Sequence, residues 1–148
     1  MESTGRLDAI WLKRAHRGKM DPVHEAELIP GRGLAESVGR SSRRQVSLLE
    51  REVWEQVTGG LGSSLNAVAR RANLLVSNMA LVRTRGRILR IGETRLVIGG
   101  ELTPCERMDE ALPGLQDALK PEWVGGVFAQ VLDGGVIRVG DVIEWESP

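Results

Sequence analysis

ILRIGETRLVIGG, residues 88–100, alternates apolar and polar side chains on both sides of a short Gly-Glu-Thr turn. Alternation with a period of two is typical of β-strands, and two such runs joined by a glycine turn predict a β-hairpin. The C-terminal stretch has the same character: GGVFAQVLD, residues 125–133, is followed by a Gly-Gly turn and then by VIRVGDVIEW, residues 136–145. We therefore expect two or three further strands there.

The N-terminal half has fewer helical signals than strand signals. Apolar residues recur at helical spacing over residues 49–57 and predict a short amphipathic helix that Gly59-Gly60 ends. A second helical turn is expected within residues 64–71. We predict strands over residues 7–12, 23–29, 45–49 and 73–77, and an exposed connection over residues 32–44. Seven or more short strands with few short helices predict a mainly β fold, a closed or nearly closed β-barrel.

Length and composition are those of one domain, residues 1–148, with its core over about residues 7–146. The 20 basic and 20 acidic residues give a formal net charge of zero, so no overall field attracts nucleic acid or an anionic membrane. The N-terminus lacks an apolar signal core, and no segment approaches the ~20 apolar residues that cross a bilayer. We expect a cytoplasmic protein without a nucleic-acid or membrane partner.

Cys105 is the only cysteine of the chain, so it cannot form an internal disulfide. Thr103-Pro104-Cys105-Glu106 has the form of a capping box, with Thr103 as N-cap, Pro104 as the first helical residue and Glu106 as its third. This register predicts a helix that begins at Pro104 and places Cys105 second in it. The sulfur would then lie beside unpaired backbone N–H groups, a setting that favours thiolate over thiol. The alternative is that Cys105 is a small buried apolar residue.

Several short motifs, taken together in their order and spacing, resemble the molybdenum cofactor sulfurase C-terminal (MOSC) domain family over about residues 7–145. The matching segments are residues 32–34, 44–49, 70–76, 86–92, 104–105, 125–127 and 140–141. This chain departs from the family where Arg71-Ala72-Asn73 replaces a common Gly-Glu-Asn sequence. The departure concerns the polar lining of the expected pocket and not the cysteine.

The resemblance implies a β-barrel that binds a molybdopterin-type molybdenum cofactor or carries sulfur. The family cysteine maps onto Cys105, either as molybdenum ligand or as persulfide carrier, and both roles need a deprotonated sulfur that ligands can reach. Cofactor contacts are then expected from loop cations, one amide, the start of the predicted helix and a glycine pair: Arg43, Arg44, Arg70, Arg71, Asn73, Thr103, Pro104, Glu106, Gly125 and Gly126. Solvated arginines, a capping role for Asn73 and a plain turn at Gly125-Gly126 are the competing interpretations.

Three functions remain open at this point. The first is a cofactor-binding domain with Cys105 on molybdenum, serving reduction of N-hydroxylated compounds. The second is a sulfur carrier in which Cys105 accepts sulfane sulfur from a separate pyridoxal-phosphate cysteine desulfurase, without pyridoxal phosphate on this chain. The third is a plain binding module. The expected partners are a cysteine desulfurase or an electron-transfer protein, while the substrate and the oligomeric state are not determined by the sequence.

Overall fold

A computed structural model describes residues 4–38 and 41–147 of the chain. Its strands are β1 (Gly5–Lys13), β2 (Met20–Val23), β3 (Glu25–Ile29), β4 (Gly33–Leu34), β5 (Val46–Glu50), β6 (Leu74–Ser77), β7 (Ile88–Ile91), β8 (Thr94–Glu101), β9 (Val127–Asp133), β10 (Gly135–Arg138) and β11 (Val142–Trp145). Its helical segments are α1 (Arg51–Gly60), the 3₁₀ turn η1 (Ala67–Arg70), α2 (Arg107–Ala111), α3 (Leu115–Ala118) and the 3₁₀ turn η2 (Pro121–Trp123).

Seven strands close into a barrel, in the order β1, β11, β7, β8, β9, β5, β6 and back to β1. The predicted hairpin is the pair β7–β8, in which Ile91 lies opposite Thr94. The ring closes where Gly5 pairs with Ile143 and Arg6 with Val142. The prediction of a mainly β, closed barrel with a few short helices is confirmed. Strand β2 pairs with β1 beside the ring, and β10, β3 and β4 form a separate three-stranded sheet.

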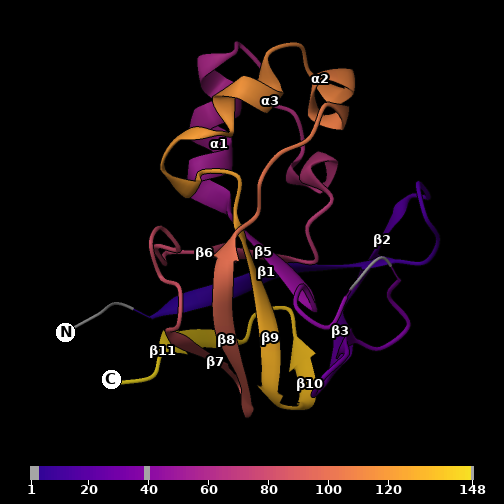
Figure 1. Ribbon diagram of the computed structural model, residues 1–148, viewed down its shortest axis with the longest axis vertical. Helices are drawn as coiled ribbons and strands as arrows, with labels where there is room; N and C mark the ends of the chain where they lie inside the picture. The colour runs from indigo at the N-terminus through magenta and orange to yellow at the C-terminus, as the bar shows by residue number, and fades with distance from the viewer. Residues whose placement is uncertain (1–3, 39–40, 148) are drawn as a thin grey trace.

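Two apolar clusters flank β5 and β6, which explains why each strand has two adjacent leucines, Leu48-Leu49 and Leu74-Leu75. Leu48 and Leu74 point into the barrel core, whereas Leu49 and Leu75, one residue further on, pack against the helices. Strands that are buried on both faces lose the alternation of half-exposed strands. Figure 1 shows α1, α2 and α3 together at one end of the molecule, with the barrel at the other.

The predicted helix near residues 49–57 is α1, and it is held by Trp54, whose indole N–H donates to the Leu65 carbonyl at 2.8 Å. Of the predicted connection over residues 32–44, residues 39–40 lie outside the described residues, and the part over residues 32–38 is less exposed than we expected. Leu34 is buried because β4 pairs with β3, opposite Leu28, and Ser37 is also buried. Strands as short as β2 and β4 give no periodic signal in the sequence.

The capping box at Thr103 does not form, and this prediction is wrong. The Leu102 N–H donates to the Gly126 carbonyl at 2.9 Å, so the chain continues as an extended segment beyond β8. Helix α2 begins at Arg107 and has no side-chain cap. Cys105 therefore precedes the helix by two residues instead of lying within its first turn. Among residues 4–38 and 41–147, no helix has the length and apolarity needed to cross a membrane.

Candidate functional site

A cavity of about 260 Å³ lies where the barrel meets the helical end of the molecule, and Cys105 is part of its wall. Strands β1, β5 and β9, the turn η1, the segment after β8 and helix α2 all contribute to it. Its lining consists of Lys13, Ser37, Val38, Arg44, Gln45, Val46, Ser47, Arg70, Arg71, Asn73, Leu102, Cys105, Arg107, Met108 and Phe128. Residues from six separate parts of the sequence thus meet around one thiol.

Its lack of acidic lining residues distinguishes this cavity from the hollow beside α1 and from the one beside η1 and α2, where Glu110 accompanies Lys19, Arg71 and Arg107. Five of its lining residues are lysine or arginine, and none of the lining residues is acidic. A larger hollow of about 420 Å³ beside α1 has one cation, Arg51, and one acid, Glu55, so it concentrates no charge. Unbalanced cations around a partly enclosed space favour an anionic ligand.

Cys105 is exposed, so the interpretation of it as a buried apolar residue is wrong. Its carbonyl accepts a hydrogen bond from the Met108 N–H at 3.0 Å, which ties the cysteine to the first turn of α2. The thiol is therefore held at the cavity wall and remains open to a ligand or reagent.

Arg70 is a buried arginine that joins three segments of the site. Its Nε donates to the Gly125 carbonyl at 2.8 Å, its Nη2 donates to the Leu102 carbonyl at 2.7 Å, and its Nη1 lies 3.9 Å from the Met108 sulfur. Burial lowers the pKa of Arg70 to about 10, and the nearby Cys105 acts in the opposite direction. Arg70 lines the cavity, but these contacts direct its donors to the protein itself.

Arg71, the next residue, also lines the cavity, but one of its guanidinium nitrogens makes no hydrogen bond to the described part of the protein. It lies in the left-handed region with φ of 64°, a conformation that costs energy for a residue with a Cβ. Its Nη2 atom is buried and has no hydrogen-bond partner in the described structure. A buried guanidinium donor without an acceptor is costly, and an anionic ligand in the cavity would satisfy it.

Lys13 and Arg107 complete the charged wall. Burial lowers the pKa of Lys13, and the charges of Arg71 and Arg107 lower it further. The pKa of Arg71 is likewise lowered by burial and by Arg107. Arg107 also forms an ion pair along α2 with the exposed Glu110, at 3.8 Å. These mutual effects show that the cations lie close enough to destabilise one another.

Asn73 lines the cavity while its side-chain amide joins two strands. Its Oδ1 accepts from the Ser47 N–H at 3.1 Å and from the Ser47 hydroxyl at 3.2 Å, and its Nδ2 donates to the Trp11 carbonyl at 3.2 Å. The amide therefore fixes β5 against β1.

Some predicted residues are not brought to the cavity wall. Thr103, Pro104 and Glu106 are absent from its lining. Gly125 and Gly126 are buried, and a Cβ at Gly126 would lie 2.3 Å from the Leu48 carbonyl oxygen, so this glycine permits close packing of backbones. Arg43 lies outside the lining, although its guanidinium is 5.2 Å from the ring centre of Phe128, which belongs to it.

Sequence reasoning missed several of the residues that line the cavity: Lys13, Ser37, Gln45, Ser47, Arg107 and Phe128. Lys13 ends a strand that we predicted, and Arg107 follows Cys105 by two residues, but only the closed barrel shows that they share one space. Within the described residues, no group of three or more His, Cys, Asp or Glu could hold a metal ion. A metal here would need most of its ligands from a cofactor, with Cys105 as its protein ligand.

The family model of the MOSC domain matches residues 21–144. A search of curated proteins gave no match. Among solved structures, the YuaD protein from Bacillus subtilis is similar, with a TM-score of 0.86 and 18% identity, over 99% of this chain and 97% of that one.

Two further structures share the fold at the same identity of 18%. YiiM from Geobacillus stearothermophilus has a TM-score of 0.76, over 97% of this chain and 75% of its own. YiiM from Escherichia coli has a TM-score of 0.71, over 97% of this chain and 70% of its own. At this level of identity, the structural similarity shows a common fold.

Proposed function

The chain belongs to the MOSC domain family, and we propose that its Cys105 cavity binds a molybdenum cofactor of the molybdopterin type, with Cys105 as the molybdenum ligand. The family is associated with molybdenum-cofactor binding and sulfurase-like functions. The observation that carries the proposal is the combination of one reachable thiol with five cations and no acid around a single cavity.

The lining residues fit the two ends of such a cofactor. A pterin phosphate needs cationic and N–H donors, which Lys13, Arg71 and Arg107 supply, and the unpartnered Nη2 of Arg71 is a donor without an acceptor. Molybdenum accepts soft thiolate ligands, which Cys105 supplies. When bound, the group would supply two-electron redox chemistry beside the thiol.

The reaction that we propose is reduction of N-hydroxylated compounds. Cleavage of the N–O bond in R–NHOH consumes two electrons and two protons and releases R–NH₂ and water. The electrons would come from a separate electron-transfer protein. Arg70 would hold the Cys105 segment in place during turnover, because it fixes the carbonyls of Leu102 and Gly125.

A sulfur carrier is the second candidate, and the exposure of Cys105 is the observation that favours it. Persulfide formation on a carrier requires a reachable thiol and a desulfurase partner. It does not require a partly enclosed cavity with five cations, so we place cofactor binding first.

Expression in a host that makes molybdenum cofactor tests the proposal. We expect wild-type protein to purify with molybdenum and pterin in near-equal amounts. Cys105→Ala and Arg71→Gln should each purify with less of both, because each variant loses one contact to the cofactor. Arg51→Gln, at the hollow beside α1, is the matched control and should behave as wild type. Equal molybdenum in wild type and Cys105→Ala would contradict the metal-ligand role, and one added sulfur on Cys105 without pterin would favour the carrier.

A further inference from the structure

A second group of cations lies directly beside the cavity, around the ring of Phe128. We call the set Arg43, Arg44, Arg85 and Phe128 the Phe128 cluster. The guanidinium carbons of Arg43 and Arg44 lie 5.2 Å and 5.0 Å from the ring centre. The Nη2 of Arg85 and the Cζ of Phe128 both lie 3.1 Å from the point where a Gly100 Cβ would stand, so the third guanidinium is also a neighbour of the ring.

Glycines make this arrangement possible. A Cβ at Gly99 would come within 2.5 Å of the Phe128 ring, and a Cβ at Gly100 would meet both the ring and Arg85. Strand β8 thus presents bare backbone to the aromatic ring at these two positions. The ring is itself buried, and the arginines extend from it into solvent.

The segment that carries Arg43 and Arg44 is fixed at its base. Gln45 is buried, donates to the Ser42 carbonyl at 2.8 Å, and accepts from the Val131 N–H at 2.9 Å. A tight turn also closes between Ser41 and Arg44, whose N–H donates to the Ser41 hydroxyl at 3.1 Å. The two guanidinium groups therefore extend from an anchored turn.

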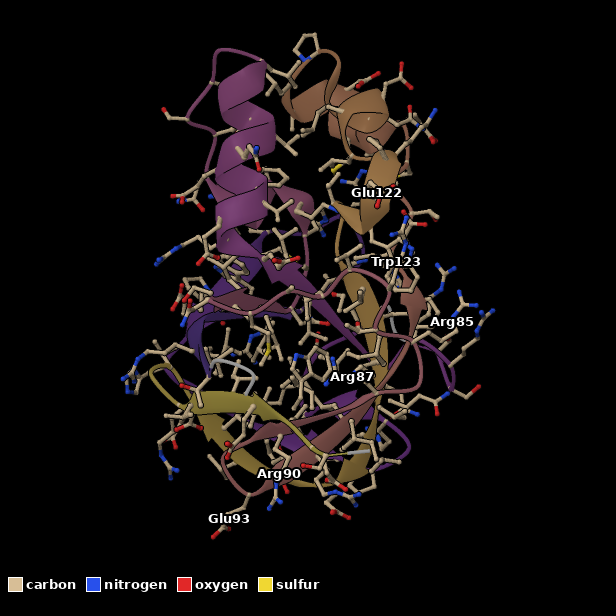
Figure 2. The ribbon with its side chains drawn as sticks, turned by 90° about the vertical axis from the view of Figure 1, so that its left-hand side faces the viewer. Arg85, Arg87, Arg90, Glu93, Glu122 and Trp123 are labelled. Carbon is tan, nitrogen blue, oxygen red and sulfur yellow. The ribbon has the colours of Figure 1, made fainter. Side chains whose placement is uncertain are left out.

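Arg85 is held from its other side. Its guanidinium lies 5.8 Å from the ring centre of Trp123, and the neighbouring Arg83 pairs with Glu122 at 2.9 Å. Figure 2 shows Arg85 and Trp123 side by side, with Glu122 above them toward the helices. Glu122 and Trp123 both have positive φ, of 50° and 59°, which is a strained conformation for residues with a Cβ.

The three arginines have aromatic neighbours. Within the described residues, none of their side chains forms an ion pair or a hydrogen bond. Three like charges around one ring repel each other, and a ring face offsets this repulsion only weakly at exposed sites. The cluster is continuous with the cavity, because Arg44 and Phe128 belong to both.

We propose that the Phe128 cluster is a second anion subsite for the ligand of the Cys105 cavity, and that this ligand carries a diphosphate group. The inference rests on the proposed function, because the first phosphate is the one assigned to Lys13, Arg71 and Arg107. Two sources supply this chemistry: a dinucleotide form of the pterin cofactor, and a nucleoside diphosphate substrate. In both, Arg44 lies between the two phosphates, and Arg43 and Arg85 bind the outer one.

Calorimetric titration with inorganic phosphate and inorganic pyrophosphate tests the subsite in the full chain without cofactor. We expect wild type to bind pyrophosphate at least tenfold more tightly than phosphate. The double variant Arg43→Gln/Arg85→Gln should lose this preference and keep its phosphate affinity within about twofold. The control Arg32→Gln/Arg90→Gln removes the same charge from exposed positions outside the cavity and should keep the preference.

The possible failures are distinguishable. Equal affinity for the two anions in wild type would overturn the second subsite and leave the first intact. Loss of both affinities in the double variant would overturn the division into two subsites. Tight pyrophosphate binding that depends on Arg43 and Arg85, without phosphate binding, would support the subsite and contradict the proposed phosphate contacts of the cavity. Absence of any binding would overturn both.

Analysis of cofactor extracted from protein made in a cofactor-producing host separates the two sources. A nucleoside monophosphate released by hydrolysis in equal amount with pterin would identify the dinucleotide. Pterin without nucleotide, together with ADP binding that the double variant loses, would identify a nucleoside diphosphate substrate. Pterin without nucleotide, with ADP bound no better than phosphate, would overturn the proposal.

Discussion

Arg70 and Arg71 are adjacent in the sequence but have different roles around Cys105. Arg70 is buried and directs its donors to backbone carbonyls on both sides of the site. Arg71 is half-buried and has an Nη2 atom without a partner. A pair of arginines in a sequence indicates a possible phosphate site, but only the surroundings show which of the two has a donor available.

We predict that Arg70→Gln destabilises the protein by about 2 kcal/mol, because hydrogen bonds from a charged donor contribute roughly 1.5–3 kcal/mol each and glutamine can restore part of them. Urea unfolding measures this change. The control Arg138→Gln, which removes an ion pair to Glu25 at 3.3 Å, should cost less than about 1 kcal/mol because both side chains are exposed. A loss at Arg70 no larger than that of the control would show that it does not hold the Cys105 segment.

The positive charge of Lys13 should lower the stability of the folded protein while it strengthens the binding of an anion in the cavity. Its pKa is lowered in the folded protein, so the unfolded chain binds this proton more tightly. The charged lysine therefore costs stability at neutral pH, and the cost disappears as the pH rises through the lowered pKa toward the usual value. We expect Lys13→Gln to raise the Tm of the ligand-free protein by about 1–3 °C at pH 7, and less at pH 10.

The same variant should bind inorganic phosphate several-fold more weakly at pH 7, because one of the cavity cations is lost. Lys19→Gln, an exposed change outside the cavity, is the control for both measurements. A Lys13→Gln protein that is less stable and binds phosphate normally would contradict the electrostatic account of the cavity.

At the scale of elements, sequence patterns predict those strands and helices that are stabilised by interactions between residues close together in the chain. Hairpin β7–β8 and helix α1 were predictable because alternation and helical spacing persist over whole elements. The capping box at Thr103 is a local signal as well, but pairing of Leu102 with Gly126 keeps that segment extended. The hydrogen bond between Leu102 and Gly126, which are 24 positions apart, forms in place of the cap, and no sequence pattern indicates it.

Gly126 directly precedes β9, and its backbone packs closely against that of Leu48 in β5. Its substitution therefore tests the junction of β5 and β9. Its φ of 103° and the 2.3 Å approach of a Cβ to the Leu48 carbonyl both exclude a side chain. We predict that Gly126→Ala costs at least about 3 kcal/mol in chemical denaturation, since strain and overpacking add.

Gly62→Ala is the matched control for Gly126→Ala. Gly62 also has a positive φ, of 74°, but a Cβ there would meet nothing within 4 Å. Its replacement should cost about 1 kcal/mol, the cost of the backbone conformation alone. Equal losses in the two variants would mean that the β5–β9 junction tolerates a side chain.

At the scale of the whole molecule, a chain of zero net charge concentrates cations in one place. Cys105, Arg44, Arg70, Arg71 and Asn73 could be predicted because the family resemblance fixes their order along the chain. Lys13 and Ser37 could not, because they reach the cavity only when β1 closes the barrel against β6 and β11. The barrel was predictable from its strands, whereas the composition of its cavity depends on which strand ends meet.

The central claim is that Cys105 is a ligand of molybdenum, and X-ray absorption at the molybdenum edge tests it most directly. Wild-type protein and Cys105→Ser, both loaded with cofactor, should differ by one sulfur neighbour of the metal, with an oxygen neighbour or none in its place. The same number of sulfur neighbours in both proteins would contradict the account.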